Sequence, residues 1–172
     1  MTEHTEHASI KRVRGVLESF LGSTETPITH LSDSARTAVD AANALGIEVG
    51  QIASSIVFRI THEGHEVPLL VVTSGRHRVD TEKVSAEHHL GKLGRADADF
   101  VRTWSGFAIG GVSPVGWLHE GLPYQPRTLV DSALENYTEV WAAAGHTHAV
   151  FPTSFTQLVQ LTLGTPSAVA TD

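Results

Sequence analysis

Gln51-Ile-Ala-Ser-Ser-Ile-Val-Phe-Arg-Ile60 is apolar and β-branched on both of the faces that alternate along an extended chain. Such a strand suits the centre of a sheet, where both faces are covered. The polar stretch His62-Glu-Gly-His-Glu66 then predicts a hairpin turn into a second strand over Val67–Thr73. We therefore expect a sheet organised around this hairpin.

Helical and extended patterns interleave on both sides of the hairpin. Apolar spacing and capping residues predict helices over 10–21, from a cap at Asp33 or Ser34 to Leu45, over about 80–90 and 97–104, and from the Ser154 capping box to Gly164. Short strands are predicted over 27–31 and around 127–134, 139–143 and 148–150. This pattern indicates an α+β fold, or mixed α/β, and not a regular doubly wound sheet.

The 172 residues show no break in composition, so we expect one domain over 1–172, with 1–8 and 167–172 as loose tails. A chain of this length buries roughly two-thirds of its unfolded surface, which supports a stable core. Hydrophobic residues make up 41% and charged residues 18%, as in soluble globular proteins. No apolar run approaches the roughly 20 residues of a membrane helix, so no membrane partner is expected.

The charge and the cysteine content narrow the classes of function. Cysteine is absent, which excludes a disulfide framework and thiolate catalysis and agrees with a reducing cytoplasm. The formal net charge is −7 with neutral histidines. This sign opposes non-specific binding of nucleic acid, because phosphate contacts depend on basic residues that release counterions. A nucleic-acid substrate would therefore need a local basic patch or a partner protein that holds it.

A glycine-rich loop over 106–116 contains Gly110-Gly-Val-Ser-Pro114 and flanks a predicted short strand. Glycine allows positive φ angles and close approach of a ligand, and successive N–H groups can bind an oxyanion or a phosphate. The alternative is a tight turn between two strands. The loop lacks the Gly-Lys-Ser/Thr of a P-loop and the G-x-G-x-x-G of a dinucleotide fold.

Other polar clusters leave several interpretations open. His146-Thr-His148 places both imidazoles on one face if it lies in a strand, as a metal site requires, but the sequence indicates no third ligand. We favour a single histidine of this group that orients a substrate or a water. A serine hydrolase is disfavoured because G-x-S-x-G is absent. Arg76-His-Arg78 either binds phosphate or is a solvated loop.

Three stretches, in this order, resemble the YbaK/EbsC-like family, small domains related to the editing insertion of bacterial prolyl-tRNA synthetase. Residues 37–58 are similar to the helix, Leu-Gly turn and following strand of that family. Gly106 and Gly110-Gly-Val-Ser-Pro114 resemble its Gly-x-x-x-Pro loop, and Ala144-Gly145 with the strand and capped helix that follow resemble its C-terminal end. The resemblance extends from the first helix to Leu163.

The resemblance implies a curved mixed β-sheet or partial barrel surrounded by helices. It also implies hydrolysis of a mischarged small amino acid from tRNA, a reaction needed because a pocket discriminates weakly between near-isosteric amino acids. The implied partners are the acceptor end of an aminoacyl-tRNA, an assisting aminoacyl-tRNA synthetase, and a second copy in a homodimer. The implied location is cytoplasmic, and neither a metal nor an organic cofactor is implied.

One position departs from the pattern of the family, because Ser54 stands in the strand where members usually carry lysine. The lysine is taken to hold the terminal ribose-phosphate region or the carbonyl of the substrate. Serine is shorter and uncharged, so it cannot inherit that role. Three explanations remain open: Arg59 or Arg76 substitutes, Ser54 positions water for a different substrate, or catalysis is lost.

The resemblance and the chemistry of the residues together predict one pocket. The Gly110–Pro114 loop, with Gly110 as its catalytic member, would supply N–H groups to the developing oxyanion. The Ser54 and Ser55 hydroxyls, with a histidine of 146–148 assigned as His146, would orient the attacking water. Substrate-binding residues are expected at Ser55, Gly106, Gly111, Ser113, Pro114, Arg76 and His148. Two functions fit these residues: a trans-editing deacylase, or a catalytically impaired module that binds a small ligand, tRNA or a synthetase.

Overall fold

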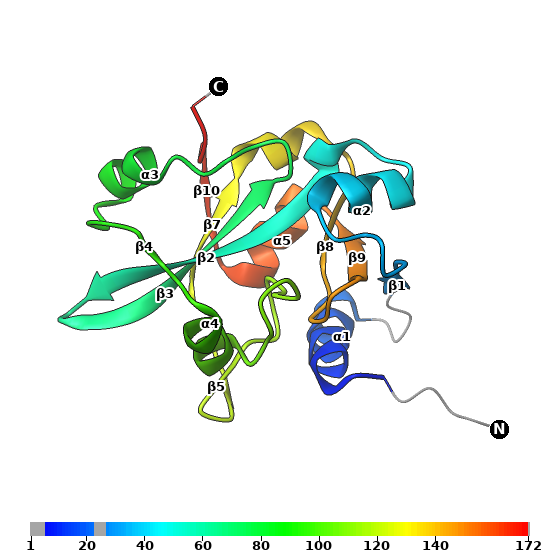
Figure 1. Ribbon diagram of the computed structural model, residues 1–172, viewed down its shortest axis with the longest axis horizontal. Coiled ribbons are helices and arrows are strands. Elements are labelled where there is room, and N and C mark those ends of the chain that lie inside the picture. The colour runs from blue at the N-terminus through cyan, green and yellow to red at the C-terminus, as the bar shows by residue number, and fades with distance from the viewer. Residues whose placement is uncertain (1–5, 23–26, 172) are drawn as a thin grey trace.

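The expected hairpin is the longest extended feature of the computed structural model, which describes residues 6–22 and 27–171. Strand β2 (Ile52–His62) pairs antiparallel with β3 (His65–Ser74), from Ala53 opposite Ser74 to His62 opposite His65. In Figure 1 this twisted ribbon crosses most of the molecule. The prediction of a central hairpin is confirmed.

The sheet around the hairpin is mixed. Within the described residues eight strands form it, in the order β1-β9-β8-β2-β3-β7-β10, with β4 against the hairpin end of β2. Pairs β2·β8, β3·β7 and β7·β10 are parallel, whereas β8·β9 and β1·β9 are antiparallel. The bounds are β1 Thr29–His30, β4 Gly94–Arg95, β7 Arg127–Asp131, β8 Val140–Ala143, β9 Ala149–Thr153 and β10 Thr165–Ser167. A mixed sheet with helices on both faces is the α+β architecture that the sequence predicts.

Helices cover both faces of this sheet (Figure 1). Helices α1, α4 and α5 contribute to the core on one face, and α3 contributes to the core on the other. A separate two-stranded hairpin, β5–β6, follows the glycine-rich loop. The bounds are α1 Ala8–Leu21, α2 Ala38–Leu45, α3 Thr81–His88, α4 Ala98–Ser105, α5 Phe155–Thr162, β5 Leu118–His119 and β6 Leu122–Pro123, with 3-10 turns at Val49–Gln51 and Ser132–Asn136.

Several element ends differ from the prediction because local capping decides them. Helix α2 is capped by Thr37 and not by Asp33 or Ser34: the Thr37 hydroxyl accepts from Asp40 N–H, and the Asp40 carboxylate accepts from Thr37 N–H. The strand expected over 127–134 ends at Asp131, because the Asp131 carboxylate accepts from Ala133 N–H and starts a 3-10 turn.

The C-terminal residues are not a loose tail. Ser167 ends β10, which pairs with β7, and Val169 is fully buried. Val169 packs in an apolar cluster with Val71 and Leu129, and burial of this side chain offsets the entropy lost when the segment orders. At the other end, α1 already begins at Ala8, and the expectation for residues 1–5 lies outside the described residues.

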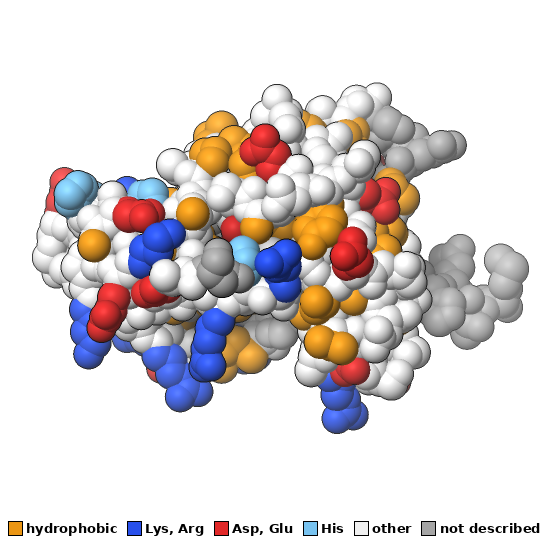
Figure 2. Space-filling model, turned by 90° about the horizontal axis from the view of Figure 1, so that it is seen from above, with side chains coloured by type: hydrophobic (Ala, Val, Ile, Leu, Met, Phe, Trp, Pro, Cys, Tyr) orange, Lys and Arg blue, Asp and Glu red, His pale blue; other side chains and the backbone are white. Residues whose placement is uncertain are grey.

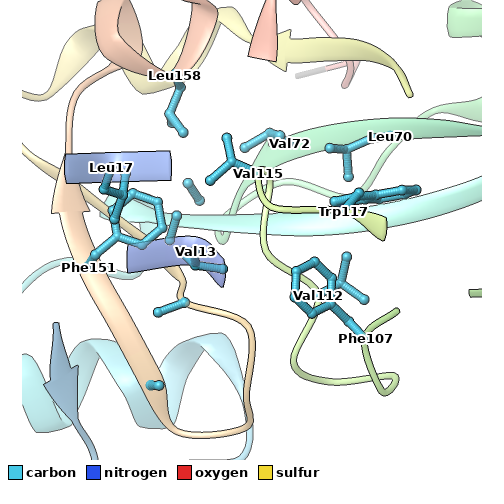
Figure 3. Packing of buried hydrophobic residues seen from close by; sticks show 14 of the residues in the cluster. Val13, Leu17, Leu70, Val72, Phe107, Val112, Val115, Trp117, Phe151 and Leu158 are labelled. Carbon is cyan, nitrogen blue, oxygen red and sulfur yellow. The ribbon is translucent and has the colours of Figure 1, made fainter. Parts of the chain in front are cut away.

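The main core lies on the α1 side of the sheet. Figure 3 shows side chains from α1, β3, the glycine-rich loop and α5 meeting there, among them Val13, Val72, Val115 and Leu158. Trp117 and Phe107 are its largest members and are almost completely buried. This core therefore fixes the glycine-rich loop against the sheet. No helix in the described part of the chain is long and apolar enough to cross a membrane.

Candidate functional site

A cleft of about 210 Å³ opens where β2 and β8 separate. These parallel strands pair only at Ile52–Trp141 and Ala53–Ala142, so the edge of β2 beyond Ala53 is left for other segments to line. The cleft is lined by β2, by α2 with the loop before it, by the glycine-rich loop, and by β8, β9 and the turn between them. Their polar or glycine members are Arg36, Thr37, Ser54, Ser55, Gly110, His146, Thr147 and His148.

The structure brings together five of the residues expected from the sequence, namely Ser54, Ser55, Gly110, His146 and His148. They come from three segments that are far apart in the chain. The other five expected residues do not line the cleft, and two of them have clear structural roles. Gly106 is the C-cap of α4 with φ +75°, and Gly111 packs behind the cleft against the β8–β9 turn.

Ser113 and Pro114 belong to the core and not to the cleft. The fully buried Ser113 hydroxyl accepts from Val115 N–H, and the Ser113 carbonyl accepts from the indole N–H of Trp117 at 2.7 Å. Arg76 lies beside the 3-10 turn before β2, where its Cδ is 3.1 Å from the position that a Cβ on Gly50 would take. Of the Gly-x-x-x-Pro loop, only Gly110 and Val112 therefore line the cleft.

Gly111 holds the glycine-rich loop against the β8–β9 turn. A Cβ at Gly111 would lie 2.9 Å from the Thr147 nitrogen and 3.0 Å from the His146 carbonyl carbon, so only glycine allows this approach. The Gly111 N–H already donates to the Ala108 carbonyl at 3.0 Å. It is therefore not one of the oxyanion donors that the sequence suggested.

Two other residues of the loop line the cleft and have N–H groups that could act as donors. Gly110 has φ +91° and open space where a Cβ would be, and both Gly110 and Val112 line the cleft. Among the described residues we find no acceptor for either N–H group. Two amides on one loop are the arrangement that stabilises negative charge on a carbonyl oxygen.

His146 and His148 lie in a turn and not in a strand, and His148 has φ 72°. The Nδ1 atom of His148 is 2.9 Å from the Ala35 carbonyl, so Nδ1 carries the proton and Nε2 is the acceptor. His146 is more exposed, and its ring lies 4.7 Å from that of His7. In the described ranges, no group of three or more His, Asp or Glu residues could hold a metal ion.

The two serines point to opposite faces of β2. Ser54 shares a face with its pairing partner Thr73, whereas Ser55 shares the other face with Val72. The Ser55 hydroxyl is buried and has no hydrogen-bond partner in the described part of the chain. Since buried hydroxyls are almost always satisfied, an atom bound in the cleft would complete the Ser55 site.

Arg59 does not line the cleft. Its guanidinium pairs with Glu66 at 2.9 Å and Asp97 at 3.5 Å, and it lies over the Phe100 ring, away from the cleft. Arg36, which the sequence did not single out, lines the cleft at the start of α2. A sequence signal existed in the Thr37-x-x-Asp40 capping box, which places Arg36 immediately before a helix.

Comparison with known proteins gives consistent results. Residues 32–161 match the model of the aminoacyl-tRNA editing domain. The uncharacterized protein YwhH of Bacillus subtilis is 30% identical over 137 residues, which are 80% of each chain. The crystal structure of a candidate trans-editing enzyme for prolyl-tRNA synthetase is 35% identical, with a TM-score of 0.84 over 98% of this chain and all of its own. The hypothetical protein APE2540, at 21% identity and a TM-score of 0.75 over 91% of this chain and 98% of its own, shares the fold.

Proposed function

Because the chain belongs to the aminoacyl-tRNA editing domain family, we propose that it hydrolyses the ester of a tRNA mischarged with a small amino acid. The observation that carries this proposal is that Ser54, Ser55, Gly110, Val112 and His148 all line one cleft. Hydroxyl, imidazole and backbone amide groups can assist ester hydrolysis by orienting water and stabilising the oxyanion.

The reaction needs no covalent intermediate, because an aminoacyl ester is already activated. The oxygen of a water bonds to the carbonyl carbon, and the ester C–O bond breaks. The proton lost by the water ends on the ribose oxygen that leaves, which gives a free amino acid and tRNA. The Ser54 hydroxyl and Nε2 of His148 orient and polarise the water, and the Gly110 and Val112 amides receive the carbonyl oxygen.

The walls of the cleft support a small amino acid as the group removed. The apolar members of its lining are mostly alanines, and the volume is about 210 Å³. These alanines belong to the loop before α2, to α2 itself and to β2, β8 and β9. They are Ala35, Ala38, Ala41, Ala53, Ala142, Ala143 and Ala149. A pocket of limited size admits small side chains and excludes larger ones, which is how editing sites spare correctly charged tRNA.

The charge distribution supports a role for a partner that holds the tRNA. The net charge is −7, and on the face shown in Figure 2 the basic side chains lie among acidic ones. Arg36 at the cleft offers one cation to the acceptor end. We propose that an aminoacyl-tRNA synthetase supplies the remaining phosphate contacts, since each contact depends on a positive side chain.

A second function, binding without catalysis, is favoured by one observation. By the resemblance described above, Ser54 stands where the family usually carries lysine, and Arg59 is engaged with Glu66. In this alternative the cleft still holds the aminoacyl end but does not accelerate hydrolysis. The two functions predict different rates for the same variants of Ser54.

We expect the unmodified protein to deacylate tRNA charged with alanine, serine, cysteine or threonine faster than the uncatalysed rate. Ser54→Ala should slow the preferred reaction by about tenfold or more, because water loses one orienting hydroxyl. The measurement is release of radiolabelled amino acid, with a Ser54→Lys variant assayed alongside. An inactive wild type beside an active Ser54→Lys would establish the binding function instead, and inactivity of both would overturn the proposal.

Gly110→Ala should slow deacylation by about tenfold to a hundredfold, since alanine is strained at φ +91° and the loop would move its amides. Gly121→Ala is the matched control: Gly121 has φ +78° and open space around it, but lies in the β5–β6 turn. Equal rates for the two variants, with equal thermal stability, would show that the loop amides take no part in catalysis.

A further inference from the structure

A groove of about 450 Å³ lies between α1 and the β5–β6 hairpin, and it has no lining residue in common with the cleft. It is hollow at Gly15, because a Cβ at this position would meet no described atom within 4 Å. Val16 of α1, which is 36% exposed, and Leu118 and Pro123 of the hairpin form apolar walls. The volume lies within the range of small-ligand sites, about 300 to 1,000 Å³.

The guanidinium of Arg12, which lines this groove, is held in a fixed orientation. Its Nε donates to the Gly116 carbonyl at 3.1 Å, and its central carbon lies 4.9 Å from the centre of the Phe107 ring. A hydrogen bond and a stacked ring together restrict the rotation of the side chain. Little further ordering is therefore needed when a ligand binds to Arg12.

The charge of Arg12 is not balanced by the described part of the protein. The Gly116 carbonyl is the one acceptor that the described residues offer it, although a guanidinium carries five N–H groups. Its Nη2 atom is buried without a hydrogen-bond partner in the same residues. Burial lowers the pKa of Arg12, and no described carboxylate forms an ion pair with it. A partly desolvated cation that lacks a counter-ion favours the entry of an anion.

The walls of the groove determine which anion suits it. A carboxylate matches a guanidinium, because its two oxygens can accept two parallel N–H bonds. The apolar walls favour a ligand whose carboxylate is attached to a hydrocarbon body, whereas inorganic phosphate would leave them unfilled. A free amino acid fits less well, since its ammonium group would lie near the cation. We propose that the groove between α1 and the β5–β6 hairpin binds a compact organic acid, a carboxylate on an apolar body.

Binding of simple acids tests this proposal. The probe is cyclohexanecarboxylate, with cyclohexylmethanol as the neutral molecule of the same shape and acetate as the carboxylate without the body. We expect the acid to bind at least about tenfold more tightly than either, because only the acid satisfies both the cation and the apolar walls. Titration followed by NMR gives the dissociation constants and shows which backbone amides respond. Equal affinity for acid and alcohol, or responses confined to the cleft, would overturn the proposal.

Filling the groove is the first test by mutation. Gly15→Leu should weaken binding of the acid by about tenfold or more, because the new side chain occupies the hollow while leucine favours the helix more than glycine does. Gly15→Ala is the matched control and should change the affinity by about twofold at most, since one methyl group leaves most of the groove open. Tight binding of the acid to a folded Gly15→Leu protein would place the ligand elsewhere.

Removing the cation is the second test by mutation. Arg12→Gln should weaken the acid by about tenfold or more and leave the alcohol unchanged, because only the acid pairs with the guanidinium. Lys11→Gln removes the same charge from an exposed neighbour that does not line the groove, and should affect neither ligand. A general loss of structure in Arg12→Gln would weaken both ligands, and a thermal melt detects it. An acid affinity that falls equally in Arg12→Gln and Lys11→Gln would overturn the assignment to Arg12.

The outcome does not depend on the proposed hydrolysis. The titrations use neither tRNA nor an ester, so a protein that deacylates none of the charged tRNAs would still bind the acid. Conversely, a deacylase that binds the acid no more tightly than the alcohol would retain the function proposed for the cleft and lose the second site.

Discussion

Replacing Asp131 with alanine is expected to lower the free energy of unfolding by about 3 kcal/mol or more, the largest effect on stability among the substitutions considered for this chain. The Asp131 carboxylate accepts from the Thr73 hydroxyl, Ser74 N–H and Ala133 N–H and contacts the His77 ring. Alanine would leave these donors buried without an acceptor, and the cost of an unsatisfied donor exceeds the value of the bond itself.

Chemical denaturation with urea measures this loss, and for a protein of this size it corresponds to a melting temperature lower by roughly 6–12 °C. Asp131→Asn should destabilise less, because the amide oxygen keeps some of the acceptors while the amide nitrogen meets donors. Glu135→Ala removes the same charge from an exposed residue of the adjacent 3-10 turn and should change little. A loss below about 1 kcal/mol for Asp131→Ala would show that the hydrogen bonds of this carboxylate are replaceable.

The fold was predictable where the signal is local or periodic. The two-faced apolar pattern of residues 51–60 identified the central strand, and the helices predicted over about 80–90 and 97–104 correspond to α3 and α4, which Asp80 and Asp97 cap. Helix α2 was found, but its cap was misassigned because Asp33, Ser34 and Thr37 are all good N-cap residues. The choice of Thr37 depends on the second hydrogen bond of the capping box, in which the Asp40 carboxylate accepts from Thr37 N–H. That bond forms only in the folded turn.

The candidate site was predictable only in part, because it is made of segments that approach in space. The resemblance to a known family indicated Ser54 and Gly110, and the local pair of histidines indicated His146 and His148; the structure places all four at one cleft. Arg36 enters the cleft through the path of the loop before α2. His77 reaches Asp131 because β3 and β7 are parallel neighbours. The capping box places Arg36 before a helix but does not indicate what that loop packs against. The contact of His77 with Asp131 leaves no pattern in the sequence, since strand order is decided by the whole chain.

Catalysis is expected to suffer most from Gly111→Ala, which should reduce deacylation by about a hundredfold. The added methyl group would lie within 3.0 Å of backbone atoms of His146 and Thr147, and backbone cannot yield as a flexible side chain can. The loop and the turn must therefore separate. This separation moves the Gly110 and Val112 amides away from His148, although none of these three residues is itself altered.

The rate is measured on the preferred aminoacyl-tRNA, with circular dichroism and a thermal melt to confirm that the variant is folded at the assay temperature. Gly15→Ala is the control, because Gly15 lies within α1 with no atom near its potential Cβ, so it should leave the rate unchanged and stabilise the helix slightly. A folded Gly111→Ala protein with the wild-type rate would mean that the distance between loop and turn is not critical. The water and the carbonyl oxygen would then be held by groups on one side of the cleft alone.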